Sequence, residues 1–370
     1  MIHSCMQSNK QRGFSIVELM VALLLGLFLV SGVTAMYISS KQSYRMTDNI
    51  SRLQESLRFS LDFMSSDIRM AGYMPCRFPP LTRNAIDNAD TGSNAWFLDY
   101  FNFGVRGYEG SAGGFPTDLP AVGTNAGDRV AGTDAIVILK ASLYTSSLSS
   151  HDATANTFTL QSNFTDSDFE RGRIGIVCDP RQAAMFQVSN AATGLKTVSY
   201  NNAANILPGN DAGVITNIGN YGADAQIAAY EPVVYYIANS TQNPAIRSLK
   251  RQNLVARASG ANEIAEMQEE ELLEGVESMQ ILYGEDTLNN DLVVDRYVTA
   301  DNVVNWQNVI TVRIGLLMAS GEQVTTQADT TTYNVAGTLI SDTSAPAHAG
   351  DRRLRYVANT TINLRNRVAN

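Results

Sequence analysis

The sequence contains little cysteine, histidine or positive charge. Its 370 residues include three Cys and three His, which leaves little material for a zinc site built from these ligands. The 27 Lys and Arg are outnumbered by 36 Asp and Glu, so the formal net charge is −9. General nucleic-acid binding favours a basic surface and is therefore not expected. Apolar residues make up 44% of the chain, which excludes an intrinsically disordered protein.

One long apolar run lies near the N-terminus. The 22 residues from Leu19 to Ser40 carry no charge. About 20 residues span a bilayer core as a helix, so this run is long enough to cross a membrane. It is too long for a secretory signal, whose apolar region has about 7–15 residues. Lys10 and Arg12 precede the run and favour a cytoplasmic N-terminus, although Lys41 and Arg45 follow it.

Glu18 interrupts this apolar block. A carboxylate in mid-membrane costs about 2.5–3.5 kcal/mol on insertion scales. In the simpler interpretation, Glu18 lies at the helix end and reaches the interface. In the second, cleavage after Gly13 gives Phe14 a free amine and makes Glu18 the fifth residue. The amine of a neighbouring chain would then pair with Glu18 and fix the axial register between subunits.

The stretch Gly13-Phe14-Ser15-Ile16-Val17-Glu18-Leu19, followed by the long apolar run, resembles the class III signal of type IV pilins and type II secretion pseudopilins. In that family a prepilin peptidase cuts after the Gly and methylates the new N-terminal Phe. The resemblance therefore implies a leader at 1–13, cleavage between Gly13 and Phe14, an N-methylated Phe14 and an assembly ion pair at Glu18. It also implies an inner-membrane protein with a periplasmic head, which later enters the pilus fibre or tip.

The helix is expected to continue beyond the membrane, from Phe14 to Met70. Apolar residues recur at steps of three or four, which indicates one helix face; they are Ile50, Leu53, Leu57, Leu61, Met64 and Ile68. Gly72 and Pro75 mark its end. The sequence thus predicts a transmembrane part at 14–40, a periplasmic helical part at 41–71 and a β-rich head at 72–370.

Short apolar runs bounded by Gly, Asn, Asp and Thr predict the strands of the head. They are Ala135–Leu139, Phe158–Leu160, Ile174–Val177, Met185–Val188, Val233–Ile237, Met279–Tyr283, Val309–Met318 and Leu354–Val357. The acidic stretch Glu263–Glu277 is expected to be helical. The predicted fold class is α+β, with the long N-terminal helix packed on an antiparallel sheet.

Cysteine use fits an oxidising compartment. Cys5 would leave with the leader, so the mature chain keeps Cys76 and Cys178. An even pair in an exported domain predicts a disulfide; two unpaired thiols are the alternative.

Further motifs resemble the PilW-type minor pilins of type IV pili over nearly the whole length. They are Ala71-Gly72-Tyr73 with Cys76, Leu282-Tyr283-Gly284, Val304-x-Trp306, and the arginine-rich end. The resemblance implies a low-abundance subunit of a priming or tip complex that initiates assembly. Its partners would be other minor pilins, the major pilin, prepilin peptidase, the inner-membrane assembly platform, the lipid bilayer and a PilY1-like tip adhesin. A J-type minor pseudopilin of type II secretion, or a tip subunit that binds DNA or adheres to surfaces, are the alternatives.

Two charged clusters are candidate contact surfaces. The acidic stretch at 263–277 is one, and the C-terminal arginines are the other: Arg352, Arg353, Arg355, Arg365 and Arg367. Ion pairs within the domain are the simpler interpretation. Docking of a partner is the functional one, because complementary charge sets partner choice and register.

A run of Asp and Asn follows Gly284. Asp286, Asn289 and Asp291 supply oxygens of the kind that Ca²⁺ prefers, but the spacing lacks the Gly and closing Glu of an EF-hand. A polar turn is favoured, so no metal is predicted.

Enzymatic activity is not expected, and neither is a cofactor. The sequence lacks G-x-S-x-G, H-E-x-x-H and G-x-x-x-x-G-K-[ST] motifs. After leader removal only His151 and His348 could serve a catalytic triad. Both lie in polar, loop-like sequence, and nothing places a nucleophile beside them.

Overall fold

The computed structural model describes residues 13, 15–76, 81–87, 96–110, 115, 119–162 and 169–366. The chain separates into two units, Met1–Ser51 and Arg52–Asn370. The helix α1 (Ile16–Arg69) contributes residues to both. Phe14, Arg367 and residues 1–12 of the expected leader lie outside the described residues.

In the first unit, α1 carries the apolar run. The helix is continuous through Leu19–Ser40, and its length and apolar composition suffice to cross a membrane. The hydroxyls of Ser31 and Thr34 donate to the carbonyls of Phe28 and Val30, so these polar groups are satisfied within the helix. The long N-terminal helix is confirmed, with bounds within two residues of those predicted.

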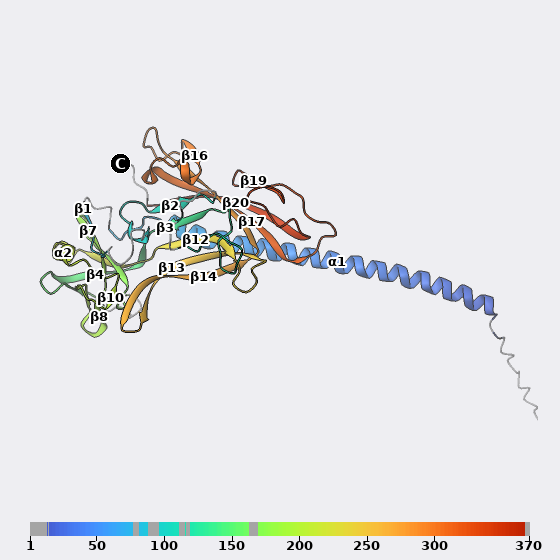
Figure 1. The fold of residues 1–370 in the computed structure, drawn as a ribbon, viewed down its shortest axis with the longest axis horizontal. Coiled ribbons are helices and arrows are strands. Elements are labelled where there is room, and N and C mark those ends of the chain that lie inside the picture. Colours follow the sequence, from blue (N-terminus) through green and yellow to red (C-terminus); the bar gives the residue numbers. More distant parts are fainter. Residues whose placement is uncertain are drawn as a thin grey trace, which may run out of the picture. The chain divides into compact units, whose positions relative to one another are not determined.

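In the second unit, α1 contributes one buried face. Leu53, Leu57, Met64 and Ile68 are at most 4% exposed, as expected from their spacing, whereas Ile50 in the first unit is 36% exposed. The buried face packs against strands of two sheets in one hydrophobic core. Figure 1 shows β17 (Val309–Gln323) and β20 (Arg353–Asn363) beside this part of the helix.

Three larger sheets and one hairpin form the head (Figure 1). The four-stranded sheet is antiparallel, in the order β16 (Arg296–Val298), β15 (Val276–Glu285), β17, β20. The six-stranded sheet has the order β10 (Ile206–Leu207), β14 (Asn262–Glu274), β13 (Arg247–Ser259), β12 (Val233–Asn239), β3 (Ala135–Ile138), β2 (Val105–Tyr108).

The eight-stranded sheet has the order β1 (Leu81–Asn84), β7 (Gln182–Gln187), β6 (Ile174–Cys178), β11 (Gln226–Tyr230), β4 (Ala141–Asp152), β5 (Thr157–Leu160), β9 (Thr197–Ser199), β8 (Asn190–Ala192). The hairpin pairs β18 (Tyr333–Val335) with β19 (Thr338–Ile340). The short helices are η1 (Trp96–Leu98), η2 (Thr193–Leu195), α2 (Ala212–Ile215), η3 (Ala300–Asn302) and η4 (Trp306–Asn308). The predicted α+β class is confirmed, and only β1–β7 and β10–β14 pair in parallel among the described strands.

The helix expected at Glu263–Glu277 is wrong: these residues form β14 and the start of β15. β14 pairs with β13 in an antiparallel hairpin over twelve residue pairs. Basic side chains on β13 lie opposite the glutamates, with Arg251 at 2.9 Å from Glu270 and Arg257 at 2.9 Å from Glu266. Cross-strand opposite charges stabilise such a ladder, and they override the helix propensity of Glu.

Candidate processing and assembly sites

Glu18 lies in the first turn of α1, three residues after Ser15. The Val17 N–H donates to Ser15 Oγ at 3.3 Å, and the Ser15 N–H donates to Glu18 Oε2 at 3.2 Å. These bonds form a variant of the capping box, in which Ser15 Oγ accepts the Val17 N–H instead of the Glu18 N–H, and they satisfy donors that a helix N-terminus otherwise leaves unpaired. The helix therefore begins where it does because of Ser15 and Glu18, just beyond Gly13.

This capping role was missed by the sequence reasoning. The signal for it is present, since Ser15-Ile16-Val17-Glu18 has the S-x-x-E spacing of a capping box before an apolar run. Only Oε2 of Glu18 accepts the capping bond. A carboxylate has two oxygens, so Oε1 can still accept a bond from another group.

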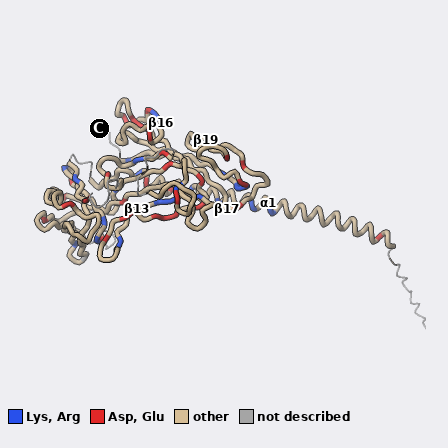
Figure 2. Tube along the Cα trace, in the orientation of Figure 1, with Lys and Arg blue, Asp and Glu red and all other residues tan. Residues whose placement is uncertain are grey.

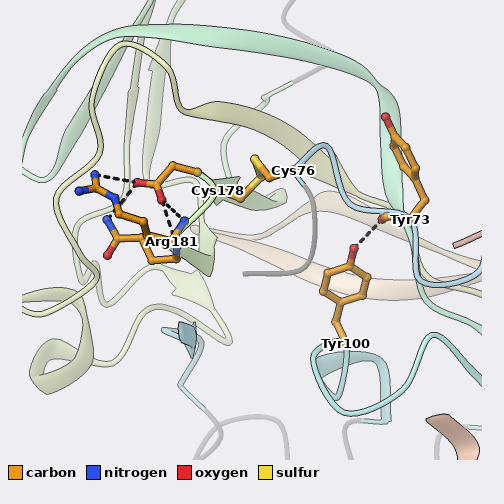
Figure 3. The surroundings of a disulfide bond; sticks show 7 residues. Tyr73, Cys76, Tyr100, Cys178 and Arg181 are labelled. Carbon is orange, nitrogen blue, oxygen red and sulfur yellow. Dashed lines mark hydrogen bonds and ion pairs between the residues drawn. A yellow bond between two sulfur atoms is a disulfide. The ribbon is translucent and has the colours of Figure 1, made fainter. Parts of the chain in front are cut away.

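The predicted disulfide is present between Cys76 and Cys178, with a Cα–Cα distance of 5.9 Å (Figure 3). It joins the segment after α1 to the last residue of β6, across a sequence separation of 102. Nearby, the Tyr100 hydroxyl donates to the Tyr73 carbonyl. The bond thus ties the end of α1 to the eight-stranded sheet.

The four described C-terminal arginines do not form one surface. The Arg355 guanidinium is fully buried and donates to both oxygens of Glu277 at 2.7 and 3.0 Å. It also donates to Asp351 and Asp329, at 2.8 and 3.1 Å. Burial opposes the charged form, but these carboxylates raise the pKa of Arg355 above its usual value.

The other arginines differ in environment. Arg353 donates to Asp351 at 2.6 Å and is largely buried. Arg352 is exposed and donates to Gln323 at 3.2 Å, and Arg365 is exposed beside α1. Figure 2 shows acidic and basic positions interleaved over the head.

The glutamates of β14 also have partners within the domain. Lys250, whose side chain is 1% exposed, lies 2.7 Å from Glu269 and 3.0 Å from Glu271. Burial alone would lower the pKa of Lys250, but its bonds to these carboxylates raise it. Backbone and hydroxyl donors at Thr241 and Ser240, with Lys250, outweigh the effect of burial and lower the pKa of Glu271 to about 2.

The Asp and Asn run after β15 forms a polar turn. Asp286 accepts bonds from the N–H groups of Asn290 and Leu292, at 3.1 and 2.7 Å. Asp291 accepts the N–H of Val293 at 3.0 Å, and Asn289 is exposed. Within the described residues, no group of three His, Cys, Asp or Glu side chains is placed to hold a metal ion.

Neither histidine is free to act as a base. His151, expected in a loop, lies in β4, where its Nδ1 accepts the Tyr221 N–H at 3.3 Å and its Nε2 contacts the Tyr200 hydroxyl at 2.6 Å. His348 is buried, and its ring nitrogens bond to the Thr331 carbonyl and the Gly350 N–H. Both rings serve as structural hydrogen-bonding groups.

Two family models match the chain. The model of the Type IV Pilus-assembly protein W matches residues 234–366, and that of the Prokaryotic N-terminal methylation motif matches residues 8–34. No curated protein and no solved structure gives a significant match. The first match contains the whole four-stranded sheet, and the second contains Gly13, Glu18 and the start of the apolar helix. Together the two matches identify the chain as a PilW-type minor pilin of type IV pili, a membrane-anchored structural subunit in the type IV pilin and pseudopilin superfamily.

Proposed function

We propose that this minor pilin takes part in a priming or tip complex that initiates assembly of the type IV pilus. Prepilin peptidase cleaves between Gly13 and Phe14 and methylates Phe14. Before assembly the chain resides in the inner membrane with its N-terminus in the cytoplasm and its head in the periplasm. It then joins other minor pilins, the major pilin and the assembly platform, with a PilY1-like adhesin at the tip. It works by assembly and catalyses no reaction.

The observation that carries this proposal is the position of Glu18. Its carboxylate stands in the first turn of a helix whose next 22 residues are uncharged, five positions after Gly13. One oxygen closes the capping box of its own chain, and the other can accept the Phe14 amine of a neighbour. A buried charge is stabilised when it is both paired and hydrogen-bonded. The carboxylate would hold two neighbouring helices at a fixed axial offset.

Processing is tested by Gly13→Ala. We expect the full-length chain to accumulate, because the peptidase must fit the residue before the cut bond. Gly32→Ala is the matched control, since an added Cβ at either glycine has no atom within 4 Å. The intact mass of the membrane-extracted protein shows whether the leader has been removed and Phe14 methylated. An N-terminus other than methylated Phe14 in the wild type would refute the assignment.

Glu18→Ala and Glu18→Gln separate charge pairing from capping. Gln keeps an acceptor for the Ser15 N–H but carries no charge. We expect both variants to be cleaved normally and to be depleted from sheared pili. Normal incorporation of the Gln variant would show that capping, not the ion pair, is what assembly needs.

The priming role is tested by deleting the gene and counting fibres. Loss of pili that returns on complementation, together with co-purification of the full chain with other minor pilins, is the expected result. Co-purification with secretion pseudopilins would favour the J-type alternative. Salt-dependent DNA binding by the purified protein would favour the DNA-binding alternative.

A further inference from the structure

β20 forms an unusually long free edge. Among the described strands, the ends of the three larger sheets are otherwise β1, β8, β10, β2 and β16, each of two to four residues. β20 has 11 residues, and β17 is its only partner within the part of the chain that the structure describes. Natural sheets keep their edges short because unpaired backbone groups recruit other strands.

The register shows which backbone groups face the open side. The Leu364 N–H donates to the Ile310 carbonyl of the β17 side. Residues alternate along an antiparallel ladder between bonding to the partner strand and pointing away from it. Even-numbered residues of β20 therefore bond to β17, and the N–H and C=O groups of Val357, Asn359, Thr361 and Asn363 point outward. The Arg365 N–H, next in the outward series, donates to the Arg69 carbonyl at the end of α1.

The edge also lacks the usual protection against pairing. Residues 356–363 read YVANTTIN, with no charged residue and no proline. Charged side chains, proline and bulges are the devices that blunt edge strands. The nearest arginine of the strand, Arg355, has its guanidinium buried against Glu277. The open segment is therefore competent to pair.

A groove of about 740 Å³ lies beside this edge. Leu57 and Leu61 of α1 and Leu143 of β4 line it, as do the even-numbered residues Tyr356, Ala358 and Thr360 of β20. A further strand beside β20 would extend the sheet over α1. Alternate side chains of that strand would then point into the groove.

The rim of the groove is predominantly basic. Arg58, Arg69 and Arg365 line it together with one carboxylate, that of Asp62. Arg58 lies 3.7 Å from Asp62, whereas Arg69 and Arg365 have no ion pair with a described residue. A segment that carries carboxylates would complement this charge.

We propose that the open edge of β20 binds an extended segment of another pilus subunit, which adds a strand to the four-stranded sheet. The segment places apolar side chains at alternate positions into the groove and carboxylates near Arg69 and Arg365. Main-chain hydrogen bonds supply affinity in this mode, and the groove supplies specificity. The inference rests on the proposed function and names the surface by which the minor pilin holds its neighbour.

Site-specific photo-crosslinking in the full-length chain tests the proposal. A photoreactive residue replaces Asn363 at the edge, and Leu195, which is 74% exposed on η2, is the control position. The probe is the set of other minor pilins and the major pilin made in the same cell. We expect an adduct from position 363 with one of these subunits, on a peptide rich in alternating apolar residues and carboxylates, and no adduct from position 195.

Two pairs of variants decide whether the backbone edge is used. Thr361→Pro removes an outward N–H, whereas Thr361→Val keeps it. We expect the Pro variant to lower the adduct yield about tenfold, as the loss of about 1.4 kcal/mol would, and the Val variant to leave it within about twofold. Should the Pro variant fail to fold, Thr360→Glu against Thr360→Lys serves instead, at a position that lines the groove, and only Glu should repel the acidic segment.

The outcomes distinguish this inference from the proposed function. An unchanged yield in the folded Pro or Glu variant overturns the inference, and so does an adduct with a helix or with a second copy of this chain. If the wild type co-purifies with minor pilins but gives no adduct at position 363, only the inference fails. If it co-purifies with no pilin at all, the proposed function fails.

Discussion

The four-stranded and eight-stranded sheets of the head differ in what they hold. The four-stranded sheet shares one core with the buried face of α1, through residues such as Met64, Ile314 and Ile362. Much of the eight-stranded sheet packs on a separate aromatic core with Phe158, Phe186 and Tyr200, which contains no residue of α1. The four-stranded sheet packs on the helix, and the eight-stranded sheet is attached to the segment after the helix through Cys76–Cys178.

The family match follows the same division. Residues 234–366 include every strand of the four-stranded sheet, whereas the strands of the eight-stranded sheet lie between Leu81 and Tyr230, before the match begins. The match thus covers the sheet that packs on α1 and carries the open edge of β20, together with β13 and β14 of the six-stranded sheet.

Removing the disulfide should have the largest effect, and it should fall on the eight-stranded sheet. For a loop of 102 residues, loop-entropy arguments give about 4.7 kcal/mol of stabilisation. We expect Cys76→Ala with Cys178→Ala to lower the free energy of unfolding by up to that amount. Hydrogen exchange should rise in β6 and β7 before it rises in β15 and β17. The wild type under reducing conditions should show the same hydrogen exchange as the double variant. An equal rise of exchange in both sheets would contradict the view that the disulfide stabilises mainly the eight-stranded sheet.

Arg355→Ala should weaken the four-stranded sheet instead. Its guanidinium joins β20 to Glu277 of β15 and to two further carboxylates. Removing one member of a buried pair costs about 3–5 kcal/mol, because the remaining charges are left uncompensated.

Arg257→Ala is the matched control for Arg355→Ala. The Arg257 side chain is 70% exposed and pairs with Glu266 at 2.9 Å, so its loss should cost at most about 1 kcal/mol. Urea unfolding measures both variants. A loss for Arg355→Ala no larger than for the control would mean that the buried network does not hold the sheet.

Much of the fold could be predicted from local sequence. The uncharged run and the apolar stripe gave α1 within two residues, because both depend on neighbours along one helix. Each predicted strand overlaps an observed strand, with only Leu139 and Val188 lying one residue beyond the ends of β3 and β7, and several strands, such as β3, are buried along their whole length. The serine-rich β4 was not predicted, because many of its side chains are exposed and its apolar pattern is weak.

The wrong helix at β14 and the unrecognised burial of Arg355 have a common physical origin, in partners that are distant in sequence. β14 looked helical because its glutamates favour a helix, while the basic residues that stabilise the strand lie opposite on β13. Arg355 could not be recognised as buried, because its partners Glu277 and Asp329 are 78 and 26 residues away. The capping role of Ser15 and Glu18, which is local, was available in the sequence and was overlooked.

Mild acid should change the stability of the four-stranded and eight-stranded sheets in opposite directions, by less than the loss of the disulfide or of Arg355. Asp134 bonds to the Ile281 N–H of β15. Burial, reinforced by the Glu109 carboxylate, raises the pKa of Asp134 to about 7. The native state then holds a proton that the unfolded state releases above about pH 4. This contribution to stability is therefore full at low pH and is lost as the pH rises through about 7.

His151 in the eight-stranded sheet has the reverse behaviour. Burial lowers the pKa of its imidazole, an effect that Asp152 only partly opposes. The native ring stays neutral where the unfolded ring is protonated, so stability is full above about pH 6.5 and falls as the pH drops below it. Each group changes the free energy of unfolding by at most about 1.4 kcal/mol per pH unit.

Hydrogen exchange resolved by region, between pH 7 and pH 5, measures these opposed trends once it is corrected for intrinsic rates. We expect β15 to become better protected and β4 and β5 less so. Asp134→Asn should flatten the first trend and leave the second, and His151→Phe should do the reverse. The two regions share one chain but stand in different electrostatic environments. If both sheets respond in the same direction, they unfold as one unit. The sheet that packs on α1 and the sheet attached by the disulfide would then not differ in stability.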